Sequence, residues 1–352
     1  MLLPILAMAQ GAGGEIRRPV RTNTNKVNNK PALQEIDYNT YNTALVEKAE
    51  LGDANAQNSL GVCYYYGRGV TQDYAKAFEW YTKSADQGNM YAQYNLGNCF
   101  YYGNGVPQDY AKAFEWYMKS ANQNDSDAQL KVGYFYDTGL GVSQDYEKAF
   151  EWYTKSADQG NMYAQYNLGS CFYYGNGVPQ DYAKAFEWYM KSANQIVSDA
   201  QLKVGYFYGT GLGVSQDYEK ALEWYTKSAD QGNMYAEYNL GLYYENGLSV
   251  SQDYEKAFEW YMKSANQNDS DAQFKVGYFY DTGLGVSQDY EKAFEWYTKS
   301  AYQGNMYAQY NLGIIYQYGR GVALDYTKAI EWYSKAADQG FEDAKEKLKA
   351  LR

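Results

Sequence analysis

The chain contains no histidine among its 352 residues. This absence excludes imidazole acid-base catalysis, histidine metal ligands and Ser-His or Cys-His nucleophile pairs. Only 3 cysteines are present, an odd number that is too small to staple a chain of this length. Proline is also scarce, with 5 residues, while 45 % of the residues are hydrophobic, so the composition predicts an ordered chain with a continuous core. We expect no metal site, no cofactor and no enzymatic activity.

Positive charge is in short supply beyond the first segment. The formal net charge is −11, of which residues 1–33 contribute +4, so the remainder carries −15. The basic side chains of that first segment are Arg17, Arg18, Arg21, Lys26 and Lys30. Nucleic-acid binding needs a basic face that releases counterions, so an acidic chain of this kind argues against nucleic acid as a partner.

Long hydrophobic runs are missing as well, because nothing after the first residues approaches the roughly 20 apolar residues of a membrane span. Residues 1–9, MLLPILAMA, form a short apolar run that ends in the small-x-small triplet Ala7-Met8-Ala9. This pattern is typical of the end of a signal peptide, so we expect export to the periplasm or the medium. A cytoplasmic location is the alternative if the run is not a signal. Residues 10–33, rich in Gly, Asn, Thr and Arg, are predicted to be a flexible linker.

The spacing of the tryptophan residues shows how the rest of the chain is organised. All 8 tryptophans stand 36 residues apart, at Trp80, Trp116, Trp152, Trp188, Trp224, Trp260, Trp296 and Trp332. Such a fixed period is the signature of a repeat architecture. A second period of 72 residues overlies it, because units beginning near Met90, Met162 and Met234 resemble one another, as do those beginning near Ser126 and Ser198.

Each unit holds two helical patterns around a glycine-rich turn. In residues 89–124 the apolar positions of the first pattern recur at helical spacing, which predicts a helix that we name helix A. Asp109 then stands as an N-cap for a second helix, named helix B. Glycine or asparagine ends most B helices in a left-handed cap. Because Ile196 stands at that place in one unit and Ser249 replaces a turn glycine in another, we expect different turns there.

The full signature of the repeat is present in the final unit. It consists of Ala308, Leu312, Gly313, Tyr316, Gly319, Gly321, Val322, Asp325, Lys328, Ala329, Trp332, Tyr333, Lys335, Ala336 and Ala337. This text resembles the Sel-one-like repeat, a relative of the tetratricopeptide repeat. The resemblance implies an all-α fold, a right-handed superhelical α-solenoid of antiparallel helix pairs. We expect an N-terminal half-repeat over residues 34–52, eight 36-residue repeats over 53–340 and a C-terminal capping helix over 341–352.

The sequence offers little evidence for a catalytic activity. Some members of the family are linked to β-lactamase activity, which needs Ser-x-x-Lys, and no such motif occurs here. A hydrolase is therefore the third hypothesis. Cys63, Cys99 and Cys171 occupy a slot that other repeats fill with apolar residues, so we expect buried free thiols.

The first hypothesis is a protein-interaction scaffold that binds a protein or an extended peptide. By the resemblance, helix A lines a concave groove, and its exposed positions lie three before, one after and four after the helix-A glycine. Tyrosine beside small polar residues is typical of recognition surfaces. The alternatives are a carbohydrate-binding module that stacks sugars on the tyrosines, and rings that merely cover the seams between repeats. The candidate residues are Tyr94, Asn98, Tyr101, Leu130, Tyr134, Asp137, Tyr166, Ser170, Tyr173, Leu202, Tyr206 and Tyr238.

Overall fold

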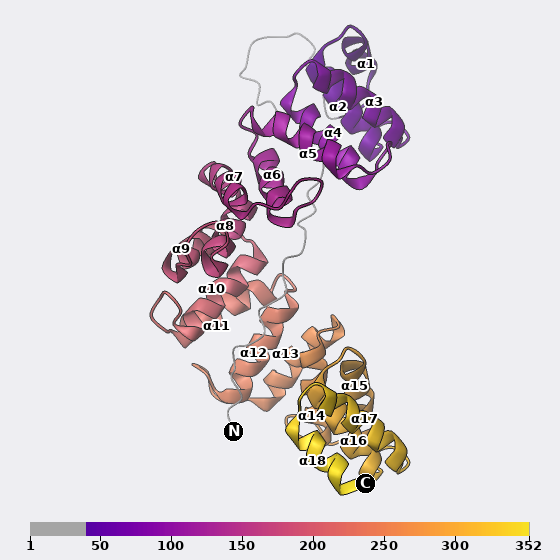
Figure 1. Ribbon diagram of the computed structural model, residues 1–352, viewed down its shortest axis with the longest axis vertical. Coiled ribbons are helices and arrows are strands. Elements are labelled where there is room, and N and C mark those ends of the chain that lie inside the picture. The colour runs from indigo at the N-terminus through magenta and orange to yellow at the C-terminus, as the bar shows by residue number, and fades with distance from the viewer. Residues whose placement is uncertain (1–39, 352) are drawn as a thin grey trace. The chain divides into compact units, whose positions relative to one another are not determined.

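A computed structural model describes residues 40–351, which form two compact units, residues 40–192 and residues 193–351 (Figure 1). Both units consist of α-helices, and the described residues include no strand. The proposed signal peptide (1–9), the linker (10–33) and the start of the half-repeat (34–52) lie outside the described residues. The all-α class and the solenoid of antiparallel helix pairs are confirmed.

The helices alternate between the two types that the sequence predicts. The first unit holds α1 (Thr43–Glu50), α2 (Ala54–Tyr66), α3 (Tyr74–Asp86), α4 (Met90–Tyr102), α5 (Tyr110–Ala121), α6 (Ser126–Thr138), α7 (Tyr146–Asp158), α8 (Met162–Tyr174) and α9 (Tyr182–Ala193). The second holds α10 (Ser198–Thr210), α11 (Tyr218–Ala229), α12 (Met234–Asn246), α13 (Tyr254–Asn266), α14 (Ser270–Thr282), α15 (Tyr290–Tyr302), α16 (Met306–Tyr318), α17 (Tyr326–Asp338) and α18 (Glu342–Leu351). Helices α2 to α16 with even numbers are A helices. Their odd-numbered partners from α3 to α17 are B helices.

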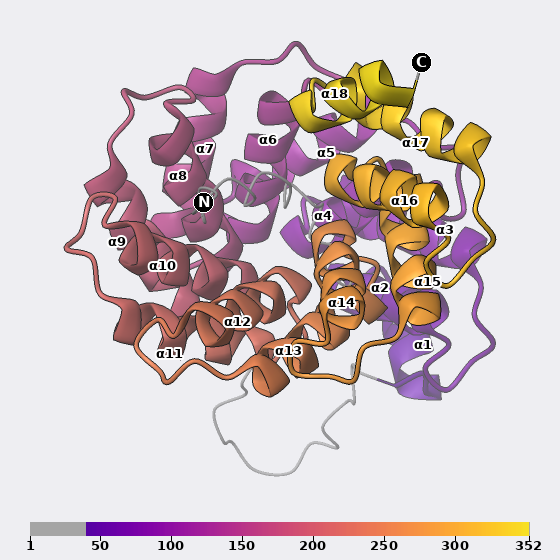
Figure 2. The same cartoon turned by 90° about the horizontal axis from the view of Figure 1, so that it is seen from below.

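Within each unit, a helix packs against the one that follows it in the chain. In the second unit, α12, α14 and α16 form one layer and α11, α13, α15 and α17 form the other (Figure 2). The even-numbered layer therefore presents helix-A side chains along one face of the unit.

Polar side chains and glycines set the helix ends. The N-cap Asp109 accepts a hydrogen bond from Lys112 N at 3.0 Å, and the same cap recurs at the other B helices. Helix α4 ends at Gly103, whose φ of 73° is left-handed. Gly105, two residues on, has a φ of 76° and lies directly on the Tyr74 main chain of the preceding repeat. A Cβ atom would not fit there, which explains the paired glycines of the turn.

A glycine–tyrosine contact forms the centre of every repeat. A Cβ atom placed on Gly97 would lie 2.7 Å from Cδ1 of Tyr117, whose side chain is 0 % exposed. The same contact joins helix A to helix B in all eight repeats. Because the glycine has no side chain, the two helices approach closely enough to enclose the ring.

The tryptophans lie one residue before those tyrosines, on helix B. Each ring is covered by the lysine three residues later, as where Lys119 Nζ lies 3.5 Å from the centre of the Trp116 ring. The same pair occurs in each of the eight repeats. The cation–π contact and the aliphatic part of lysine shield the indole from water.

Glutamine and serine side chains join successive helices. Gln159 donates to the Gln129 side chain at 2.7 Å, and Gln129 in turn donates to the Ala121 carbonyl at 3.3 Å. Ser156 donates its hydroxyl to the carbonyl of Ser126 at 2.6 Å. Similar bonds recur along the chain, so the polar groups that lie between helices are largely satisfied.

The expectation of different turns at Ile196 and Ser249 is wrong. Ile196 has a φ of 66°, close to the 68° of Asn124 and the 73° of Asn268 at the equivalent places. Ser249 keeps a left-handed φ of 54°, and its hydroxyl donates to the Tyr218 carbonyl at 3.1 Å. Packing of the flanking helices fixes both turns, and the residues adopt a conformation that they intrinsically disfavour.

Replacing Ile196 and Val197 by the residues that another repeat carries at these places is expected to stabilise the second unit. The following residue, Val197, is the N-cap of α10 and supplies no side-chain hydrogen bond, whereas Asp269 accepts from Ala272 N at 2.7 Å. The double change Ile196→Asn and Val197→Asp should raise the free energy of unfolding by about 1–2 kcal/mol, through the cap and the relief of strain. Urea denaturation followed by circular dichroism measures it. The reverse change, Asn268→Ile with Asp269→Val, is the matched control and should destabilise by a similar amount; equal stability of all three proteins would contradict this account.

The cysteine prediction is confirmed. Cys99 and Cys171 are buried free thiols, and Cys63 is buried in the same slot. Burial raises the pKa of Cys99 and that of Cys171 to about 12. A thiol that stays protonated is a poor nucleophile, so these residues serve the core.

Candidate functional site

The predicted groove residues divide into two groups by burial. Half of the twelve are almost fully enclosed, and for these the expected exposure is wrong: Tyr94 at 1 %, Asn98 at 1 %, Tyr101 at 4 %, Leu130 at 8 %, Tyr166 at 7 % and Leu202 at 3 %. The others are half-buried, namely Tyr134, Asp137, Ser170, Tyr173, Tyr206 and Tyr238. Their role in binding a partner stays a prediction.

The rings three residues before the helix-A glycine extend the core. Tyr94 packs on Tyr117 with ring centres 5.6 Å apart, and Tyr166 packs on Tyr189 at 5.4 Å. Tyr238 makes the same contact with Tyr261 at 5.5 Å in the second unit. These contacts lie within single repeats, so the alternative that the rings cover the seams between repeats stays a prediction.

The polar groove residues have a structural task that sequence reasoning missed. Asn98 accepts a hydrogen bond at 2.8 Å from the hydroxyl of the buried Tyr117. Asp137 does the same for Tyr153 at 3.2 Å, and Ser170 lies 2.9 Å from the hydroxyl of Tyr189. A buried hydroxyl needs such a partner. The signal was present in the sequence, because most A helices carry a polar residue one or four places after the glycine.

Half-exposed aromatic side chains remain in the second unit. Phe274 lies next to Tyr278, with ring centres 6.5 Å apart, and next to Tyr307 at 5.7 Å. All three are half-buried and come from α14 and α16. We call these three residues the aromatic cluster. Such partly exposed rings offer a large apolar contact area at low cost in side-chain entropy.

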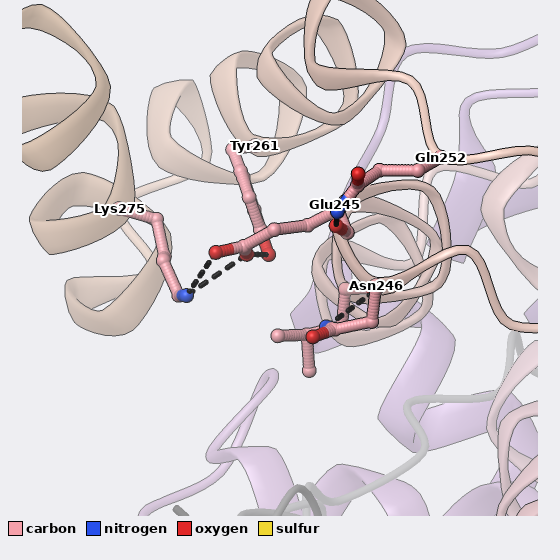
Figure 3. Close-up of polar contacts among 6 residues, drawn as sticks. Glu245, Asn246, Gln252, Tyr261 and Lys275 are labelled. Atoms are coloured by element: carbon pink, nitrogen blue, oxygen red, sulfur yellow. Dashed lines mark hydrogen bonds and ion pairs between the residues drawn. The ribbon is translucent and has the colours of Figure 1, made fainter. Parts of the chain in front are cut away.

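An enclosed ion pair lies on the same layer of helices. Lys275 Nζ of α14 is 3.0 Å from Oε1 and 2.9 Å from Oε2 of Glu245 on α12, and the Tyr261 hydroxyl donates to the same carboxylate (Figure 3). The Lys275 and Glu245 side chains are only 20 % and 16 % exposed. The sequence did not reveal this pair, because its members lie thirty residues apart in different repeats.

The end of α12 holds this carboxylate in place. Gln252 Nε2 donates to the Glu245 carbonyl at 2.8 Å, and Asn246 Nδ2 donates to the Leu242 carbonyl at 2.8 Å (Figure 3). The first bond ties the last turn of α12 to the loop that follows it, and the second lies within the helix. Glu245 is thereby presented by a rigid helix end rather than by a loop.

Several aspartates of the second unit are unusually hard to ionise. Burial raises the pKa of Asp269 to about 6; the cap hydrogen bond from Ala272 N opposes this rise, and the nearby Asp271 charge adds to it. Burial also raises the pKa of Asp271 and of Asp281. In the three groups the dominant cause is the loss of water around the carboxylate.

The described residues offer neither a metal centre nor a membrane helix. Between residues 40 and 351, no three His, Cys, Asp or Glu side chains are arranged to hold a metal ion. Over the same range, each helix is too short or too polar to cross a bilayer. What the geometry does offer is a surface of aromatic and charged side chains on helix A.

Eight consecutive segments of the chain match the Sel1 repeat: residues 54–89, 91–125, 126–161, 163–196, 198–233, 235–269, 270–305 and 307–341. The chain belongs to the Sel1 repeat family. The resemblance noted in the sequence is thus confirmed. No match was found among curated proteins.

Two solved structures of this family are similar to the chain. One is c5321, a protective antigen present in uropathogenic Escherichia coli strains that displays an SLR fold; it is 40 % identical with a TM-score of 0.80. That similarity covers 88 % of this chain, which spans 66 % of the antigen's length. The other is a Sel1 repeat protein from Oxalobacter formigenes, 31 % identical with a TM-score of 0.67, and it covers 92 % of this chain and 98 % of that one.

Proposed function

We propose that this Sel1 repeat protein is a non-catalytic scaffold that binds a partner protein on the helix-A face of residues 193–351. Sel1 repeats are in general protein-interaction modules. The observation that carries the proposal is the aromatic cluster of Phe274, Tyr278 and Tyr307, which is half-exposed and contains three rings, whereas the first unit has the buried Leu130 at the place of Phe274. Clustered aromatic residues of this kind supply most of the binding energy at protein interfaces.

The ion pair beside the cluster adds specificity to that surface. Glu245 and Lys275 hold one charge of each sign on a rigid support. A partner that covers this pair must offer it polar groups, because taking the two charges further out of water costs binding energy. No catalytic step enters the proposal, since the chain lacks histidine and Ser-x-x-Lys.

Binding is expected to depend on the aromatic cluster. The full chain serves as bait for proteins of the native host, next to a variant with Tyr278→Ser and Tyr307→Ser. We expect the variant to retain a specific partner at least about tenfold less, because two apolar contacts are lost. Quantitative mass spectrometry of the captured proteins measures the ratio.

The repeat provides a matched control for this experiment. Tyr134 and Tyr163 occupy the same places in the first unit as Tyr278 and Tyr307 in the second. The change of both to serine should leave capture unchanged. Equal capture by all three proteins would remove the aromatic cluster from the interface, and capture of glycans alone would favour the carbohydrate-binding alternative.

We also propose that the chain is exported, on the strength of residues 1–9. Cell fractionation of the host with sequencing of the mature N-terminus tests it. A cytoplasmic protein that keeps Met1 would overturn this proposal.

A further inference from the structure

One position of the repeat alternates between an acid and an aromatic ring along the second unit. The second residue of the helix is Asp199 in α10, Tyr235 in α12, Asp271 in α14, Tyr307 in α16 and Asp343 in α18. These residues are 36 apart in the chain, so they stand at the same place in successive repeats. We call these five residues the acid–ring row.

The acid–ring row is open to solvent. Its first four members are half-buried and Asp343 is exposed. Asn233 Nδ2 donates to Asp199 Oδ1 at 2.8 Å, and Asn305 Nδ2 donates to Asp271 Oδ1 at 2.8 Å. An ionised carboxylate can accept about four hydrogen bonds. Each of the two aspartates is therefore held in one orientation and can still accept from further donors.

The rings of the row lie beside its carboxylates. Burial raises the pKa of Tyr235, and nearby carboxylate charges, including those of Asp199 and Asp271, raise it further. Tyr307 contacts Phe274 of α14, the helix that carries Asp271, with ring centres 5.7 Å apart. A guanidinium or ammonium group can lie over such a ring and pair with the carboxylate next to it.

The negative charge of this face is only partly offset. Among the described residues Asp271 has no ion-pair partner, because Lys275, one turn along α14, is bound to Glu245. Lys203 is the cation nearest to Asp199. Burial raises the pKa of Asp199 and that of Asp271, so both carboxylates are costly to keep ionised, and a cation from outside would reduce that cost. Helices α10, α12, α14 and α16 together carry five acidic side chains and two lysines, a net charge of −3.

We propose that the acid–ring row docks an extended, arginine-bearing segment of the partner protein, with guanidinium groups that lie on the rings and pair with the aspartates. The inference rests on the proposed function, because the row shares its face with the aromatic cluster. Arginine suits the row better than lysine, since its planar group stacks on a ring and bonds a carboxylate through two N–H groups. A neutral sugar could stack on the same rings, but it brings no positive charge to the aspartates.

The period of the row sets the spacing of the arginines. Side chains of successive A helices are in contact, as between Phe274 and Tyr307 or Lys275 and Glu245, so their axes lie about 8–10 Å apart. The aspartates occur in every second repeat and are therefore about 16–20 Å apart. An extended chain advances about 3.3 Å per residue and turns alternate side chains to the same side. Arginines about six residues apart therefore match the aspartates.

Binding of a designed peptide to the full chain tests the proposal. The probe is a fluorescein-labelled peptide of glycine and serine with an arginine at every sixth position. We expect fluorescence anisotropy at low salt to show at least about tenfold tighter binding than for the same peptide with citrulline, which has the shape of arginine without its charge. Added salt should weaken the binding. Equal affinity for the two peptides, or no binding of either, would overturn the proposal.

A conservative double variant assigns the binding to the row. Asp199→Asn with Asp271→Asn removes both charges, while the amide oxygens can still accept from Asn233 and Asn305. We expect about tenfold weaker binding of the arginine peptide. Asp127→Asn is the matched control, because Asp127 stands at the same place in the first unit and is only 5 % exposed, and it should leave the affinity unchanged. Circular dichroism confirms that all three proteins are folded. Undiminished binding by the double variant would refute the assignment.

Capture of host proteins separates this inference from the proposed function. The double variant keeps the aromatic cluster intact. Capture of the same partner by the double variant at the unmodified level would overturn the acid–ring row as its docking site and leave the proposed function standing. If the double variant captures less while Tyr278→Ser with Tyr307→Ser captures as much as before, the row is supported and the aromatic cluster is not. Binding of neutral glycans without binding of the arginine peptide would overturn the inference in favour of a carbohydrate ligand.

Discussion

Replacing Gly205 by alanine is expected to lower the free energy of unfolding of the second unit by about 3 kcal/mol. The added Cβ would lie 2.7 Å from Cδ1 and 2.8 Å from Cε1 of Tyr225, which is 2 % exposed. Overpacking of a core costs about 1–3 kcal/mol or more, and the enclosed ring leaves little room to relax. The sign is diagnostic, because alanine alone would favour the helix by about 1 kcal/mol.

Gly232 is the matched control for this change. It has a left-handed φ of 79° and no atom within 4 Å of an added Cβ, so Gly232→Ala meets only conformational strain. That strain costs about 1 kcal/mol. Urea denaturation gives the total loss for both variants, and hydrogen exchange shows whether α10 and α11 open first, as expected for a repeat array whose stability is a sum of local terms. A smaller loss at Gly205 than at Gly232 would refute the close contact as the determinant of the repeat.

The contact between glycine and tyrosine also shows what the sequence could predict. The 36-residue period, the cap residues and the glycines follow from short-range rules, and the structure places them as those rules require. The helix pairs and the solenoid follow from the same pattern. Local regularity was enough for the fold because each repeat contacts mainly its neighbours.

The candidate site was harder to predict, because periodicity alone does not show how deep a face is buried. Tyr94 and Tyr166 lie on the predicted face of helix A, but their rings pack on core tyrosines. Asn98 and Ser170 lie there too, yet they serve buried hydroxyls. Ile196 adopts its left-handed turn because the helices on either side impose it, which a rule for single residues does not capture.

Removing one member of the Glu245–Lys275 ion pair is expected to destabilise the second unit strongly. Removing one member of a buried pair leaves an uncompensated charge at a cost of about 3–5 kcal/mol, and the partial exposure of these side chains reduces that figure. We expect Lys275→Met to lower the free energy of unfolding by about 2–3 kcal/mol, measured by urea denaturation at neutral pH. Methionine keeps most of the apolar length of lysine, so the loss reports chiefly on the charge.

A second substitution separates the cost of the lone charge from the worth of the pair. Gln317 already accepts from Tyr333 in the last repeat, so Glu245→Gln can still accept from Tyr261 without carrying a charge. The double variant Glu245→Gln with Lys275→Met should therefore return to within about 1 kcal/mol of the unmodified protein. Arg320→Met breaks a more exposed pair, 3.8 Å from Asp281 with 43 % of the arginine side chain exposed, and should cost less than about 1 kcal/mol. If the double variant were as unstable as Lys275→Met alone, the loss would lie in side-chain packing, and the charges would be free to serve the partner-binding surface alone.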